Sequence, residues 1–101
     1  MKISININHQ ELEQYCVRNH IEKLSLFGSI LREDFNEQSD IDVLVRFEEG
    51  HVPGFFKLAD MEEELSRLMG GRKVDMRTSE DLSRYFRKDV INEALVQYDA
   101  G

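Results

Sequence analysis

The chain has little of what cross-links, anchors or exports other proteins: its 101 residues include one cysteine, one proline and no tryptophan. Because Cys16 is alone, no intrachain disulfide and no cysteine-based metal cluster can form from this chain. No apolar run approaches the roughly 20 residues needed to cross a bilayer, and the amino terminus lacks the apolar core of a signal peptide. We therefore expect a cytoplasmic protein that does not insert into membranes.

Basic residues are also scarce relative to acidic ones. Thirteen Lys and Arg side chains stand against 20 Asp and Glu, which gives a formal net charge of −7. Such a chain repels phosphate backbones and shows no Lys/Arg stripe, so strong general nucleic-acid binding is disfavoured. With 41% hydrophobic residues, no repeat and no low-complexity linker, the sequence predicts one globular domain over residues 1–101.

The apolar periodicity predicts a short series of helices and strands. Helical spacing favours helices over 10–19, over a segment from about Leu58 that stops at Gly70-Gly71, and over 82–95 in one or two pieces. Alternation predicts strands over 23–27, 40–47 and 73–77, whereas Ile3, Ile5 and Ile7 fit either a short strand or an extended arm. The fold class that follows is α/β (α+β), with a small mixed β-sheet, helices packed on one face and the opposite face open.

Three aspartates are the candidates for chemistry. Asp40 and Asp42 lie two apart on a predicted strand, so their side chains share a face about 6.6 Å apart, from a rise of roughly 3.3 Å per residue. Adjacent carboxylates repel, and hard oxygen ligands suit Mg²⁺ or Mn²⁺, so two ions about 3.5 to 4 Å apart would fit here. A third carboxylate, Asp75, reaches the same site if its strand lies beside that of Asp40 and Asp42.

A phosphate cradle is predicted at the Gly28-Ser29 pair. Glycine lets the backbone approach a phosphate without a Cβ in the way, while Ser29 offers a hydroxyl and the following helix start offers unpaired N–H groups. Arg32, one turn later, would add positive charge. No Gly-Lys-Ser or Gly-Lys-Thr occurs in the chain, which excludes a P-loop.

These pieces form the spacing Gly-Ser-x10-Asp-x-Asp within the segments LFGSILR (26–32) and SDIDVLV (39–45). The pattern strongly resembles the minimal nucleotidyltransferases of the DNA polymerase beta superfamily, over nearly the whole chain. Asp75, within Val74-Asp75-Met76, matches the position of that family's third carboxylate, and residues 87–94 resemble its closing helix. The resemblance implies a polymerase beta-like nucleotidyltransferase fold.

Small stand-alone members of this type resemble the antitoxins of HEPN/MNT toxin-antitoxin pairs, whose partners are helical ribonucleases. The resemblance implies an enzyme that transfers AMP from ATP to a tyrosine of the HEPN toxin, with two Mg²⁺ ions as cofactors. The alternative is an antitoxin that neutralises its toxin by contact, with a vestigial or regulatory nucleotide site. By position, the implied roles are catalysis and metal binding for Asp40, Asp42 and Asp75, and nucleotide binding for Gly28, Ser29 and Arg32. For Arg32 and Arg77 the alternatives are a phosphate contact and a simple surface charge.

Other polar side chains have simpler interpretations. The histidines His9, His20 and His51 show no metal-ligand spacing and are predicted to be surface residues. The acidic run Glu62–Glu64 fits the solvated face of the long helix, with contact to a basic partner as the alternative.

The aromatic residues leave two alternatives open. Tyr15, Tyr85 and Tyr98 fit the core or its rim by their helical spacing, with acceptance of a nucleotide as a minor hypothesis. Phe55 and Phe56 fit either the core or an exposed patch.

Overall fold

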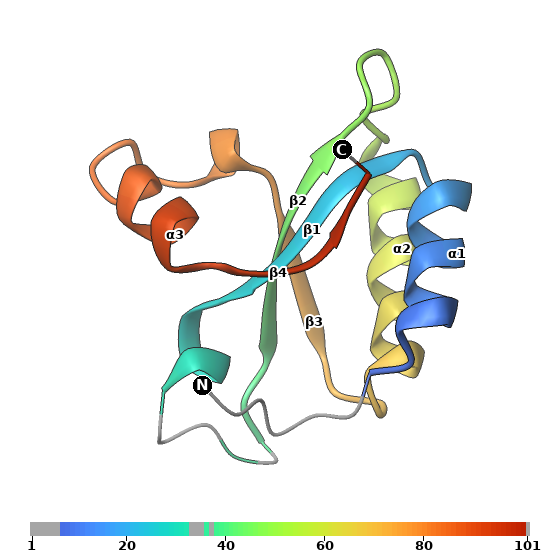
Figure 1. The fold of residues 1–101 in the computed structure, drawn as a ribbon, viewed down its shortest axis with the longest axis horizontal. Coiled ribbons are helices and arrows are strands. Elements are labelled where there is room, and N and C mark those ends of the chain that lie inside the picture. Colours follow the sequence, from blue (N-terminus) through green and yellow to red (C-terminus); the bar gives the residue numbers. More distant parts are fainter. Residues whose placement is uncertain (1–6, 33–35, 37, 101) are drawn as a thin grey trace.

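A four-stranded mixed sheet forms the centre of the computed structural model, which describes residues 7–32, 36 and 38–100 (Figure 1). The strand order is β3-β2-β1-β4. Strand β1 is antiparallel to both of its neighbours, and β2 is parallel to β3. In chain order the elements are α1 (His9–Arg18), β1 (Ile21–Phe27), the 3₁₀ turn η1 (Gly28–Leu31), β2 (Ile41–Phe47), α2 (Phe55–Leu68), β3 (Val74–Arg77), the 3₁₀ turn η2 (Ser79–Asp81), α3 (Arg87–Glu93) and β4 (Leu95–Asp99).

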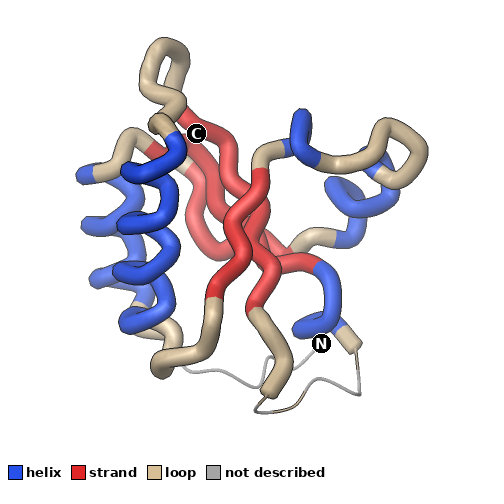
Figure 2. The backbone as a smooth tube through the Cα atoms, turned by 180° about the vertical axis from the view of Figure 1, so that it is seen from behind, coloured by secondary structure: helices blue, strands red, loops and turns tan. Residues whose placement is uncertain are grey.

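Helices α1 and α2 lie side by side on one face of the sheet (Figures 1 and 2). The Asn8 side chain begins α1 by accepting hydrogen bonds from the backbone N–H groups of Gln10 and Glu11, at 3.0 and 3.1 Å. Helix α2 ends where predicted, because Gly70 and Gly71 both adopt positive φ, which glycine reaches without steric cost. Both helices bury an apolar face against the strands.

Strand β2 alternates between the two faces of the sheet. Ile41, Val43 and Val45 are buried in the core under the helices, whereas Asp42 and Leu44 are half-buried on the opposite face. Strand β3 repeats the pattern, since its Val74 and Met76 are buried while Asp75 is not. The predicted separation of an apolar face from a carboxylate face is therefore present in the structure.

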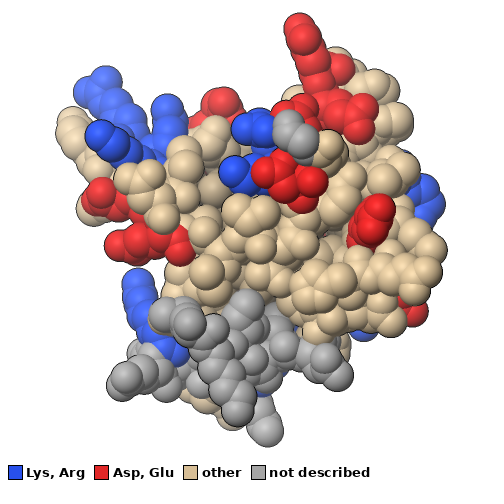
Figure 3. Space-filling view, in the orientation of Figure 1, with Lys and Arg blue, Asp and Glu red and all other residues tan. Residues whose placement is uncertain are grey.

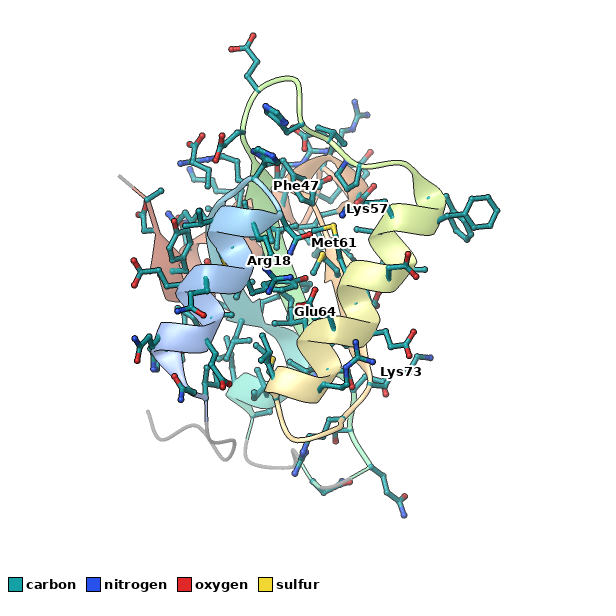
Figure 4. All side chains as sticks on the ribbon, turned by 90° about the vertical axis from the view of Figure 1, so that its right-hand side faces the viewer. Arg18, Phe47, Lys57, Met61, Glu64 and Lys73 are labelled. Carbon is teal, nitrogen blue, oxygen red and sulfur yellow. The ribbon has the colours of Figure 1, made fainter. Side chains whose placement is uncertain are left out.

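The acidic run on α2 is partly used inside the fold. Glu64 forms an ion pair with Arg18 of α1 at 2.8 Å, which links the two helices (Figure 4). Glu62 accepts a hydrogen bond from the backbone N–H of Met76 at 2.8 Å, and so covers part of the outer edge of β3. The interpretation of Glu62–Glu64 as a solvated face thus fits only Glu63, whose partner is the exposed Arg67 one helical turn away.

The C-terminal segment differs from the prediction of helices up to residue 95. Helix α3 stops at Glu93, Ala94 is extended (φ −61°, ψ 139°), and Leu95 opens strand β4 on the edge of β1. Val96 and Tyr98 pair with Ser25 and Leu24 of β1 in an antiparallel register. Pairing with a distant strand supplies hydrogen bonds that local periodicity does not reveal, so the helical spacing was misleading there.

Two remaining expectations concern the amino-terminal segment and membranes. Ile3 and Ile5 lie outside the described residues, while Ile7 packs against the core without belonging to a strand. Among the residues that the structure describes, none of the helices has the length and apolarity needed to span a bilayer.

Candidate active site

Asp42 and Asp75 stand opposite each other across the parallel strands β2 and β3. Both side chains are half-buried on the sheet face away from α1 and α2. The pKa of Asp42 is raised, first by burial and then by the negative charge of Asp75, while a hydrogen bond from the Ser29 backbone N–H and the charge of Arg77 act in the opposite direction. The fold thus holds two carboxylates together at an electrostatic cost.

Arg77 partly offsets that cost at Asp75. Its Nε and Nη2 atoms donate hydrogen bonds to Asp75 Oδ2 at 3.2 and 3.1 Å. The side chains of Arg77 and Asp75 are 46% and 36% exposed, and an ion pair this open adds little to stability. Its geometric effect is to orient the Asp75 carboxylate toward the end of β3 that bears Arg77.

The Gly28-Ser29 bend lies directly beside Asp42. Strand β1 ends at Phe27, whose partner on β2 is Asp42, so the next residue turns across that carboxylate. Gly28 has φ +74°, and a Cβ at this position would overlap Asp42 Oδ2. The Ser29 hydroxyl donates a hydrogen bond to the backbone carbonyl of Asp40 at 3.3 Å, which ties the bend to the start of β2. Only glycine fits this conformation and this approach.

Asp40 is the least fixed of the three aspartates. It precedes β2 by one residue, is exposed, and contributes only a minor part of the rise in the pKa of Asp42. The carboxylate oxygens of the three aspartates are not all within 4.8 Å of one another. Among the described residues, the group whose possible ligand atoms lie that close together is a different one, His20, Glu48 and His51. The fold therefore pairs Asp42 with Asp75 and leaves Asp40 at the margin.

The donor set fits hard divalent cations. Asp40, Asp42 and Asp75 offer only carboxylate oxygens, the ligands that Mg²⁺ and Mn²⁺ prefer. Within the described part of the chain neither Asp40 nor Asp42 forms an ion pair with Lys or Arg, so two of the three negative charges have no basic partner. A cation bound here would offset the repulsion from Asp75, which adds to the effect of burial in raising the pKa of Asp42.

A cavity of about 310 Å³ opens next to the Gly28 bend. Phe27, Leu31 and Val90 give it apolar walls, while Arg32 and Glu93 add charge. The sequence pointed to Gly28 and Arg32, but nothing in it indicated that Val90 and Glu93 of α3 would complete this cavity. That placement depends on β4 returning to β1, which brings α3 to the side of the sheet that bears the carboxylates (Figure 1).

A second cavity, of about 130 Å³, lies on the same face of the sheet. Its lining includes Lys23, Ser25, Leu44, Arg46 and Ile91. Leu44 follows Asp42 by two residues on the same side of β2, so the cavity is a neighbour of the carboxylates. The sequence does not indicate these residues, because the alternation of β1 and β2 identifies a shared face but not what covers it.

Known proteins are similar to this chain in sequence. Residues 10–100 match the family of Polymerase beta nucleotidyltransferases. The chain belongs to this family. Over 75 residues it is 36% identical to the protein adenylyltransferase MntA of Thermococcus cleftensis, an alignment that covers 74% of this chain and 73% of the relative.

Solved structures agree with this assignment of fold. One, described as a "putative minimal nucleotidyltransferase", superposes with a TM-score of 0.69 at 31% identity and covers 86% of both chains. Another, a toxin-antitoxin crystallised with AMP-PNP, has a TM-score of 0.71 at 17% identity, over 92% of this chain and 74% of that one. The predicted fold class is confirmed, and so is the resemblance to the nucleotidyltransferase family. In this nucleotidyltransferase the carboxylate face of the sheet lies beside the Gly28 bend.

Proposed function

We propose that this nucleotidyltransferase is an antitoxin that transfers AMP from ATP to a tyrosine hydroxyl of a partner HEPN ribonuclease toxin and so neutralises it. Two comparisons support the proposal. A relative 36% identical is a protein adenylyltransferase, and a structure of the same fold is a toxin-antitoxin with the ATP analogue AMP-PNP. The observation that carries it is the Asp42–Asp75 pair held in register beside the Gly28 bend.

The three aspartates would hold two Mg²⁺ ions, with Mn²⁺ as a substitute. When bound, such ions supply charge stabilisation for the phosphate oxygens and for the oxygens that attack and leave. Asp42 is the central ligand, because it contacts the bend and faces Asp75. Asp40 and Asp75 approach from its two sides, and the exposed position of Asp40 leaves it free to turn inward.

The nucleotide would lie along η1. Gly28 brings the backbone close to the phosphates, and Ser29 offers its hydroxyl from the same bend. The adjoining cavity is wide enough, and apolar enough at Phe27, Leu31 and Val90, to receive the nucleoside, while Arg32 adds positive charge beside the phosphates. In the reaction the acceptor hydroxyl gives up its proton to water and its oxygen attacks the α-phosphorus, the bond between that phosphorus and the bridging oxygen breaks, and pyrophosphate leaves.

The acceptor would approach on the side where α3 lies. Arg84 lies just before α3 and Arg87 and Lys88 form its start, and basic side chains lie over this part of the surface together with acidic ones (Figure 3). This segment lies beyond the carboxylate face of the sheet rather than over α1 and α2 (Figure 1). These basic side chains would contact the phosphates of ATP or an acidic region of the partner, beside the acidic Asp89 and Glu93 of the same helix.

Co-expression with the toxin tests the proposal. The intact mass of the toxin is measured after co-expression with wild-type protein, with Asp42→Ala and with Asp60→Ala, an exposed aspartate of α2 on the opposite side of the sheet. We expect AMP additions with wild type and Asp60→Ala and none with Asp42→Ala. A toxin that is unmodified but tightly bound by the wild type would favour neutralisation by contact alone.

The acceptor residue requires its own control. A toxin in which the modified tyrosine is changed to phenylalanine should receive no AMP from wild-type antitoxin. If labelled AMP reaches the toxin at an undiminished rate with Asp42→Ala, or reaches the phenylalanine toxin, the assignment of the metal ligand or of the acceptor is wrong.

A further inference from the structure

His20 meets two side chains of a distant turn, Glu48 and His51, at the opposite end of the sheet from the carboxylates. The ring nitrogens of His20 and His51 and a carboxylate oxygen of Glu48 all lie within 4.8 Å of one another. The two imidazoles stack with their centroids 3.9 Å apart and their planes 13° apart. His20 Nδ1 lies 3.6 Å from Glu48 Oε1. These histidines were predicted to lie on the surface, but the contact between them was not predicted.

The backbone holds the three residues in place. The backbone N–H of Glu48 donates a hydrogen bond to the carbonyl of His20 at 2.8 Å, and that of His51 donates to the carbonyl of Glu48 at 3.0 Å. Gly50, with φ +79°, allows the tight turn between Glu48 and His51. His20 itself adopts φ 57°, uncommon for a residue with a Cβ. Such a conformation costs energy, and it places the imidazole against the turn.

The donor set has a defined chemical preference. Two imidazoles and one carboxylate are the protein ligands of many open zinc sites, whereas Mg²⁺ and Ca²⁺ favour oxygen alone. The side chains of His20 and Glu48 are about half exposed, so the imidazoles have room to rotate out of their stacked arrangement and turn their lone pairs toward one ion, while water fills the remaining positions. Each of the three ligands comes from a segment fixed by backbone hydrogen bonds, which limits the entropy lost on binding.

This cluster is separate from the proposed active site. In the pairing of β1 with β2, Ile21 and Phe47 form one end of the register, and Phe27 and Asp42 form the other. His20 and Glu48 flank the first end directly. A cation bound here would therefore link the start of β1 to the loop that leads into α2. It would not contact the carboxylates.

From these observations we infer that His20, Glu48 and His51 form a second metal site, selective for a borderline first-row cation such as Zn²⁺ over Mg²⁺. Bound Zn²⁺ would fasten the turn after β2 to the residue before β1 and stabilise the folded chain, because the unfolded chain does not hold these ligands together. The inference does not depend on the proposed AMP transfer.

Thermal unfolding with and without Zn²⁺, in saturating Mg²⁺ throughout, tests the site. We expect Zn²⁺ to raise the Tm of the wild type and of His9→Gln, whose histidine is exposed and outside the cluster. The rise should disappear in His51→Gln and in His20→Asn, where asparagine tolerates the positive φ. An equal rise in His51→Gln and wild type, or none in wild type, overturns the inference.

Co²⁺ as a spectroscopic substitute gives a second measurement that does not depend on stability. Wild type should develop visible absorption bands of nitrogen-ligated Co²⁺, and Zn²⁺ should abolish them by competition. Titration should show binding weakened at least about tenfold in His51→Gln and in Glu48→Gln, because each loses a ligand. Asp42→Ala should retain the bands, and their loss in that variant would place the ion at the carboxylates and refute the separate site.

Discussion

The two faces of the sheet are built on opposite principles although the same strands supply both. Toward α1 and α2 the strands present apolar side chains such as Leu24, Leu26 and Val43, each with no exposed surface. Toward α3 the same strands present Asp42, Asp75 and Arg77, all at least partly exposed. The first face lowers the free energy of the folded state through burial, whereas the second holds like charges together.

The residues that stabilise the fold and the residues proposed to carry out the chemistry therefore lie on different faces of the sheet. Substitutions on the apolar face should change unfolding and affect transfer only through it. Removing a charge from the carboxylate face should change transfer and leave stability equal or improved, as expected where a site keeps unfavourable interactions for function.

The largest expected effect is on the apolar face, at Leu65. This α2 side chain is completely buried in the core, so Leu65→Ala leaves a cavity and should lower the free energy of unfolding by about 2–5 kcal/mol. Urea denaturation measures the change. Phe55→Ala, at a side chain 80% exposed on the same helix, should stay within about 0.5 kcal/mol of wild type. Equal losses in both variants would contradict the assignment of the core.

On the carboxylate face, Gly28→Ala should reduce the rate of AMP transfer by about 10²-fold, or roughly 2.7 kcal/mol in the barrier. The new methyl group would displace the Asp42 carboxylate, and the backbone would be strained at φ +74°. Gly54→Ala is the matched control, because nothing lies within 4 Å of its added Cβ and its φ is −75°. Single-turnover transfer assays compare the two, and a Gly28→Ala enzyme of wild-type rate would remove the bend from the site.

A smaller effect is expected at Tyr15, the one hydroxyl that joins α1 to α2 among the described hydrogen bonds. Tyr15 Oη donates to the carbonyl of Met61 at 2.9 Å, and burial raises the pKa of the phenol. Tyr15→Phe keeps the packing but leaves a buried carbonyl with one partner fewer, so the free energy of unfolding should fall by about 1 kcal/mol. Transfer at a temperature well below unfolding should be unchanged. A loss of transfer in the folded variant would show that this face is not purely structural.

The smallest expected effect is a gain in stability, at Asp42. Because folding raises the pKa of Asp42, the folded state binds more protons and the wild type loses stability as the pH rises through that pKa. Asp42→Asn removes the buried charge and should raise stability at pH 7, without divalent ions, by less than about 1 kcal/mol, since the group is partly solvated. The difference should vanish near about pH 3, where the carboxyl is protonated in both states. Melting curves at both pH values check the sign, and a variant less stable at pH 7 would contradict it.

Sequence patterns identified those parts of this fold whose causes are local. The alternation of Ile41, Val43 and Val45 gave the strand and its two faces, and Gly70-Gly71 gave the end of α2. The spacing from Gly28 to Asp42 likewise indicated the bend and the carboxylate that it contacts. Each of these depends on neighbours within a few residues or on a motif of fixed length.

What the sequence did not reveal depends on contacts between distant segments. Strand β4 forms because Val96 and Tyr98 meet β1, although the residues before them have helical spacing. Val90 reaches the cavity beside Gly28 only as a result of that pairing. His20 and His51 are 31 positions apart (51 − 20), and only the turn after β2 brings them into contact.

The alternation along β2 also limits how this chain can vary. A one-residue insertion or deletion within the strand would turn Asp42 toward the helices and an apolar side chain toward the proposed nucleotide site, so the interior would receive a charge and the proposed metal ligand would be lost together. Such a variant would be both misfolded and inactive. A library of length variants in this strand should therefore contain no folded but inactive members, whereas one of point substitutions at its outward positions should contain many.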